Sequence, residues 1–190
     1  MTKVTIVAKP AGEALNLTIA LANELDVPIF VFSNLWIYGE NGNQELDPQH
    51  VYTSINRKGE LTLGKIVYPV PKEIFVESQA IPFAIKLEGR KSSSESFQLR
   101  LPIREHSPYY LSEDASMWDE ISISTIQCFV EYFVDVDGLK LHEAPFPNSF
   151  RLEHPKLMQS IVRAKSDPIA VDIRGLRRAD KFERFTSESR

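Results

Sequence analysis

The stretch that decides the fold is residues 15–38, L-N-L-T-I-A-L-A-N-E-L-D-V-P-I-F-V-F-S-N-L-W-I-Y. In its first half, apolar residues alternate with small or polar ones, a period typical of a strand with one buried face. This apolar row consists of Leu15, Leu17, Ile19 and Leu21. Residues 23–26 supply turn chemistry, and Pro28, which has no N–H to donate, suits the start of a second strand. From 29 to 32 both parities are apolar, so we expect this second strand to be central in its sheet.

Short runs of the same kind recur along the chain between glycine and proline residues. We expect strands over residues 3–9, 50–56, 60–68, 83–87, 97–103 and 121–134, and another from residue 139. Two runs change their apolar parity, at Gly64 and near Thr125, and each change predicts a β-bulge. The pattern favours an all-β fold, an immunoglobulin-like antiparallel β-sandwich with extra strands and a short C-terminal extension.

Turn residues predict how several of these strands are connected. Asn41 and Gly42 indicate a hairpin after the second strand, and Asp137 with Gly138 predicts a turn that ends the longest one. The polar tip at 89–94 makes the strands on either side of it the clearest hairpin of the chain. Residues 157–162 have helical apolar spacing but are flanked by prolines, so one helical turn and an edge strand are both open.

The alternation also predicts the core. The row from Leu15 to Leu21 should face Phe97, Leu99, Leu101 and the even-numbered residues between 126 and 134. These positions share one parity in each run, and this places them on the buried faces of the two layers.

Composition limits the classes of function. The chain has 190 residues, 43% of them hydrophobic, enough for one β-sandwich domain over residues 1–185, and we expect a disordered tail at 186–190. A net charge of -4 disfavours nucleic-acid binding. Cys128 is the single cysteine, and no apolar run approaches the length of a bilayer span, so we expect a cytoplasmic protein without disulfides or membrane contact.

Residues 15–32 resemble the first strand pair of many bacterial immunoglobulin-like sandwich domains, including the intracellular proteinase-inhibitor type. The resemblance rests on an alternating strand, an asparagine, a turn with aspartate, and P-I-F-V-F. It implies the fold and transfers no catalytic or binding residue. Because one such domain has about 100 residues, extra strands must extend the sandwich here.

The best candidate for a binding site is the long connection at residues 104–120, R-E-H-S-P-Y-Y-L-S-E-D-A-S-M-W-D-E. Aromatic residues beside charges are common in recognition surfaces, and loops on a rigid scaffold often carry function. The predicted binding residues are Tyr109, Tyr110, Trp118, Glu113 and Asp114. The same aromatic residues would also serve to pin a long loop to the sandwich edge, and we weigh this reading above binding.

Other chemistry finds little support in the sequence. The four histidines have no metal-ligand spacing, and apolar neighbours suggest that Cys128 is an inert buried thiol. We expect no cofactor and no bound metal. The leading hypothesis is a non-enzymatic binding or accessory module that contacts another protein or its own copy through loops or an edge strand. The alternatives are a metal-dependent hydrolase built from His106, His142 and nearby carboxylates, or a structural subunit of an assembly.

Overall fold

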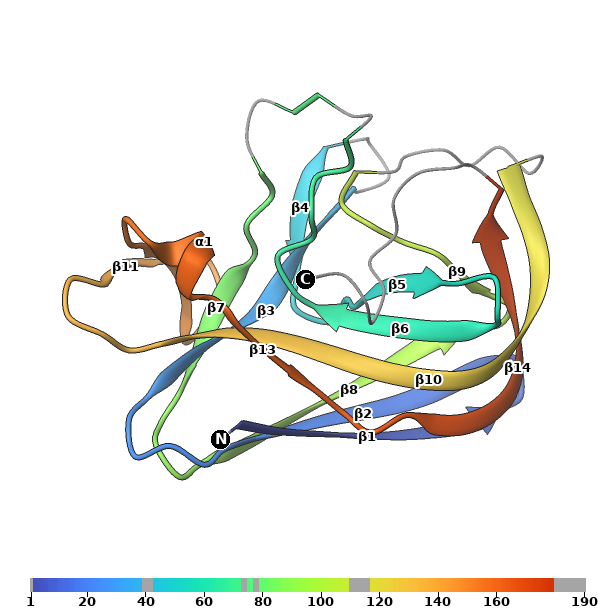
Figure 1. Cartoon of the computed structure of the whole chain (residues 1–190), viewed down its shortest axis with the longest axis horizontal. Helices are drawn as coiled ribbons and strands as arrows, with labels where there is room; N and C mark the ends of the chain where they lie inside the picture. The colour runs from blue at the N-terminus through green and yellow to red at the C-terminus, as the bar shows by residue number, and fades with distance from the viewer. Residues whose placement is uncertain (1, 39–42, 73–74, 77–78, 110–116, 180–190) are drawn as a thin grey trace.

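The protein folds into two β-sheets packed face to face, as the computed structural model in Figure 1 shows. The structure describes residues 2–38, 43–72, 75–76, 79–109 and 117–179. The smaller sheet has the strand order β1 (Thr2–Ala11), β2 (Ala14–Asn23), β8 (Ser92–Arg100). Both of its pairings are antiparallel. The predicted all-β fold class is therefore confirmed.

The larger sheet is built around two adjacent long strands, β3 (Ile29–Tyr38) and β10 (Trp118–Val134). Its main path runs β11 (Lys140–Glu143), β12 (Ser149–Glu153), β7 (Phe83–Leu87), β3, β10, β14 (Ile169–Arg178), β9 (Ile103–Arg104). Four more strands attach to this path: β4 (Gln44–Asp47), β5 (Tyr52–Ile55), β6 (Glu60–Lys65) and β13 (Val162–Lys165). As predicted, β3 is a central strand, since β7 and β10 flank it.

Strand β10 organises the larger sheet because it pairs with four other strands along its 17 residues. Along one edge it pairs with β14 and then with β13, and along the other with β6 and then with β3. The register against β14 shifts between Ile123 and Thr125. This shift confirms the bulge predicted near Thr125, and it marks the place where β10 also begins to pair with β6.

The prediction of antiparallel pairing throughout was wrong, because the larger sheet is mixed. β6 runs parallel to β10, and β9 runs parallel to β14. Parallel neighbours require a long connection between them, and the chain between β6 and β10 contains three further strands. Such a pairing leaves no turn motif in the local sequence.

The hairpin predicted across residues 89–94 was also wrong. β7 pairs with β3 and β12, whereas β8 pairs with β2, so the turn carries the chain from one sheet to the other. The turn after β2 makes the same crossing, and the two turns contact each other. Arg90 donates its backbone N–H to Leu25 O at 3.0 Å, and its side chain forms an ion pair with Asp26.

No bulge occurs at Gly64, contrary to the prediction. Gly64 continues the regular register of β6 against both Tyr52 and Phe129. Residues 61–65 are all buried, so the apparent change of parity reflects burial on both faces of β6, whose two edges are paired with β5 and β10. The hairpin predicted near residue 42 does pair as β3 and β4, although residues 39–42 themselves lie outside the described residues.

Two further connections differ from a simple reading of the sequence. The turn at Gly138 is present, with a φ of 86°, but β11 pairs with β12 and does not fold back on β10. Residues 157–162 form both of the predicted alternatives in succession, the short helix α1 (Leu157–Ser160) and then the start of β13. None of the described helices has the length and hydropathy needed to cross a membrane. The predicted tail, 186–190, lies outside the described residues.

The predicted core is confirmed. Leu15 pairs with Leu99 and Leu17 with Phe97 within the smaller sheet. All four belong to or pack against one apolar cluster, which also contains the even-numbered β10 residues Ile126, Cys128, Val130 and Tyr132. The smaller sheet is therefore held on the larger one by the rows that alternation identified.

Two glycines with positive φ allow the packing at one turn to be tested. A Cβ at Gly59 (φ 77°) would lie 2.2 Å from the backbone oxygen of Ser122 in β10, whereas one at Gly12 (φ 62°) would meet nothing within 4 Å. We expect Gly12→Ala to lower the free energy of unfolding by about 1 to 2 kcal/mol, the usual cost of a left-handed residue. Gly59→Ala should cost at least about 2 kcal/mol more, since β10 must move. Urea denaturation of both variants checks this, and equal losses would contradict it.

Candidate functional site

The structure places two of the sequence-predicted binding residues, Tyr109 and Trp118. Both are half-buried. The hydroxyl oxygen of Tyr109 accepts a hydrogen bond from Ala80 N at 3.0 Å, and its ring lies against Tyr68. The Trp118 ring lies beneath the guanidinium of Arg104, at 5.9 Å. These contacts agree with the pinning role that the sequence favoured. Tyr110, Glu113 and Asp114 lie outside the described residues.

The two histidines of the hydrolase hypothesis are not brought together. His142 lies on β11, at one end of the larger sheet, and contacts the Glu153 carboxylate at 2.9 Å. His106 lies beside β5, where it forms a backbone bridge with Thr53. Among the described residues, no group of three or more histidine, cysteine or acidic side chains could hold a metal ion.

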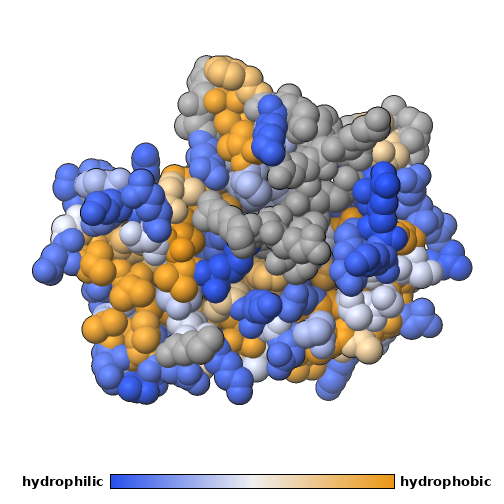
Figure 2. Space-filling model, viewed as in Figure 1, coloured by the Kyte–Doolittle hydropathy of each residue, from blue (hydrophilic) through white to orange (hydrophobic). Residues whose placement is uncertain are grey.

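A cleft of about 510 Å³ opens where β8 leaves the smaller sheet, and we name it the inter-sheet cleft. Its walls are mainly apolar and come from the end of β8, from β9, from the start of β5 and from β14. The apolar lining residues include Val51, Leu99, Leu101, Ile103 and Leu176. On the face shown in Figure 2, by contrast, apolar residues at the surface are interrupted by hydrophilic ones. The inter-sheet cleft has a volume and a lining suited to holding a ligand.

A pair of histidines lines this cleft. His50 lies two positions before the first residue of β5, and the bridge to Thr53 holds His106 opposite it. Nε2 of His50 and Nδ1 of His106 are 2.8 Å apart, and the His106 ring stacks on Tyr52. Burial lowers the pKa of His50 to about 3, with help from His106 and Lys65, and burial lowers the pKa of His106 to about 4. Both rings are therefore neutral at pH 7.

Neutrality fixes what the histidine pair can offer a ligand. Two neutral imidazoles carry one N–H each, and one of these lies in the bond between the rings. Whichever ring donates that bond, its other nitrogen is an acceptor, and the other ring keeps a donor. The pair therefore has one donor and one acceptor left for a polar ligand group. The two residues are far apart in the sequence and lack any motif, so sequence reasoning missed the pair.

Two arginines give the cleft its charge. Arg100 and Arg104 both line it and both are exposed. None of the residues that line it carries a carboxylate, although the chain as a whole has a net charge of -4. The cleft is therefore locally positive on an acidic protein, and this combination favours a ligand with negative charge.

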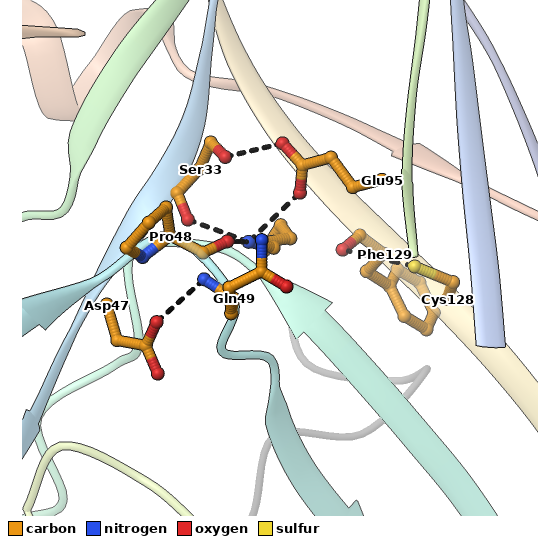
Figure 3. Close-up of polar contacts among 8 residues, drawn as sticks. Ser33, Asp47, Pro48, Gln49, Glu95, Cys128 and Phe129 are labelled. Carbon is orange, nitrogen blue, oxygen red and sulfur yellow. Dashed lines mark hydrogen bonds and ion pairs between the residues drawn. The ribbon is translucent and has the colours of Figure 1, made fainter. Parts of the chain in front are cut away.

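A second polar centre, the buried Lys65, joins the two sheets, and its partners Ser33, Pro48 and Glu95 are labelled in Figure 3. The lysine is 3% exposed, and its ammonium donates to Ser33 O at 2.8 Å and to Pro48 O at 3.0 Å. It also contacts the carboxylate of Glu95, on β8, at 3.1 Å. Burial lowers the pKa of Lys65, and Glu95 opposes that shift. Since all three N–H bonds are engaged, this lysine is a structural ammonium and not a nucleophile.

The thiol of Cys128 lies close to this network and is fully buried. Burial raises its pKa to about 12, so it stays protonated at neutral pH. A protonated thiol is a poor nucleophile and a poor metal ligand. The prediction that the Cys128 thiol is buried is confirmed.

No protein-family model matches the chain, and no curated protein or solved structure matches it. The immunoglobulin-like resemblance stays a prediction.

The Lys65 contact predicts a specific loss of stability. Glu95→Gln leaves the lysine charge buried without its counter-ion, and we expect the free energy of unfolding to fall by about 2 to 4 kcal/mol. The matched control is Glu88→Gln, which removes an exposed partner of Lys86 and should cost less than about 1 kcal/mol. Chemical denaturation measures both, and equal losses would show that Lys65 does not need its partner.

The histidine pair predicts a pH dependence. Below about pH 6.5 an unfolded histidine binds a proton, while His50 and His106 stay neutral in the fold until about pH 3 and about pH 4. The unfolded state then holds more protons than the folded state. The free energy of unfolding therefore decreases as the pH is lowered, by about 1.4 kcal/mol per pH unit for each histidine. Urea denaturation from pH 7 to pH 4 should show this slope in the wild type and in His142→Gln, which removes an exposed histidine. The double variant His50→Gln with His106→Gln should lose it, and parallel curves would contradict the assignment.

Proposed function

We propose that this protein is a non-enzymatic binding module that recognises a segment of another protein at the inter-sheet cleft. The observation that carries the proposal is the combination of apolar walls with Arg100 and Arg104 in a cleft whose lining has no carboxylate. Apolar walls favour burial of an apolar side chain, and a guanidinium binds a carboxylate through two parallel hydrogen bonds. The ligand is therefore a segment that carries both an apolar and an acidic residue.

The size of the cleft supports a partner segment of a few residues. A volume of about 510 Å³ is within the range of pockets that enclose a small ligand, and a protein segment would insert one or two side chains there. The donor and acceptor of the histidine pair would suit a peptide group, which needs one of each. Such recognition requires no reaction and no cofactor.

The aromatic connection that the sequence singled out is adjacent to this cleft. Trp118 contacts Arg104, and Arg104 lines the cleft. Trp118 would then support the arginine in its binding position, because an aromatic face under a guanidinium restrains it. The hydrolase alternative receives no comparable support, since His106 and His142 lie in different parts of the fold.

The proposal is tested by reversing the charge of the cleft. In affinity capture from native extract, quantified by mass spectrometry, Arg100→Glu with Arg104→Glu should lose at least about 90% of the specific partner, about the effect of 1.4 kcal/mol. The control, Arg57→Glu with Arg151→Glu, makes the same change in net charge at two exposed arginines outside the cleft. A partner retained equally by both double variants, or no partner specific to the wild type, would refute the proposed function.

A further inference from the structure

The free edge of β8 extends the inter-sheet cleft. In the described part of the chain β8 pairs with β2 alone. Asn23 donates its N–H to Lys91 O at one end of this ladder, and Leu101 donates to Glu13 O at the other. Both β8-side partners are odd-numbered, and in a strand the N–H and C=O of alternate residues point to opposite edges. The odd-numbered residues of β8 therefore bond to β2.

It follows that the even-numbered residues direct their backbone groups away from β2. These are Ser92, Ser94, Ser96, Gln98 and Arg100. No described strand bonds to them along this edge. A row of open N–H and C=O groups is a template for one more strand.

The edge also lacks the features that usually prevent such pairing. Natural edge strands are protected by proline, lysine, bulges or inward-pointing charge. β1, at the opposite edge of the same sheet, carries Lys3, Lys9 and Pro10. β8 contains no lysine or proline, and its inward charge, Glu95, is neutralised by Lys65. Pairing of a further strand would therefore bury no uncompensated charge from β8.

We propose, on the basis of the proposed function, that the partner docks by adding an extended segment to the free edge of β8. Arg100 belongs to this edge, and both Arg100 and its β8 neighbour Leu99 line the cleft, so the added strand would pass the mouth of the cleft. Side chains of one parity would enter the space between the sheets, where Leu99 and Leu101 lie. Those of the other parity would lie beside the exposed serines and Arg100. The partner is thus a segment of another protein in which apolar and acidic residues alternate.

Amide hydrogen exchange of the full chain, followed by NMR, tests the edge directly. In the free protein, the amides of Ser94, Ser96 and Gln98 should exchange at least about tenfold faster than those of Glu95 and Phe97, which bond to β2. The probe is the capped peptide acetyl-(Glu-Val)₄-Glu-amide, and its addition should slow exchange at the three even-numbered positions. A free protein without this alternation, or peptide binding that leaves these amides unprotected, would overturn the proposal.

A substitution pair tests the same edge by affinity. Ser96→Pro removes an N–H that points away from β2, a position where an edge strand tolerates proline. Ser96→Ala is the matched control, because both variants lose the exposed contact of the Ser96 hydroxyl with Thr18. In fluorescence anisotropy, proline should weaken binding of the peptide at least about tenfold and alanine less than about twofold. The exchange experiment needs no variant, so it remains decisive if Ser96→Pro unfolds.

The outcomes separate this inference from the proposed function. If Arg100→Glu with Arg104→Glu abolishes peptide binding and Ser96→Pro does not change it, the cleft binds its partner without strand addition, and this inference alone fails. A second outcome is that the peptide shows no binding at concentrations up to about 1 mM, which means a binding free energy weaker than about -4 kcal/mol. If the captured partner nevertheless depends on the two arginines, the inference again fails alone. A partner that is indifferent to the arginines refutes the proposed function. If light scattering shows that the wild type is a dimer and that Ser96→Pro is a monomer, the edge of β8 binds a second copy of this chain. That result would overturn the proposal that the occupant is another protein.

Discussion

The contact between Lys65 and Glu95 is the constraint on which the arrangement of the two sheets depends. Apolar packing holds the sheets together but is not directional, so it tolerates small sliding movements. A buried ammonium with three acceptors is far less tolerant, because any shift that breaks one contact leaves charge in an apolar interior. Lys65 comes from β6 and Glu95 from β8, and the Glu95 carboxylate also accepts a hydrogen bond from Ser33 of β3 at 2.6 Å. The contact therefore fixes the smaller sheet on the larger one.

Alternation along the sequence predicted the strands and the core, because a strand with one buried face has apolar residues at every second position. The rows containing Leu17 and Phe97 are examples. Turn chemistry predicted where the chain turns but not where the next strand goes. The turn at Arg90 looked like a hairpin tip, yet it crosses between sheets because its contacts with Leu25 and Asp26 hold it to a second crossing turn. The parallel pairing of β6 with β10 is equally invisible, since the residues that pair, such as Glu60 and Thr125, are far apart in the sequence and no local motif joins them.

The candidate site was harder to predict for the same reason. The aromatic residues at 109 and 118 were recognisable from composition, and Trp118 does reach the rim of the cleft through Arg104. The pair of His50 and His106 exists only because one backbone bridge at Thr53 brings two distant segments together. A signal for Lys65 was present, since this lysine is the only charged residue between Leu61 and Tyr68. The role of Lys65 could not be predicted without its partner, because Glu95 lies on β8 but ahead of the strand predicted at 97–103.

The ion pair between the sheets also determines what β8 presents to a partner. In a strand, the face of a side chain and the edge of its backbone groups alternate together, so a shift of one residue exchanges both. Glu95 must point inward to reach Lys65, and this makes the odd-numbered residues the ones that bond to β2. The amides of Ser94 and Ser96 are then necessarily directed to the free edge, and Leu99 is directed to the cleft. A single buried contact thus sets the register of the core, the orientation of the open edge and the lining of the inter-sheet cleft.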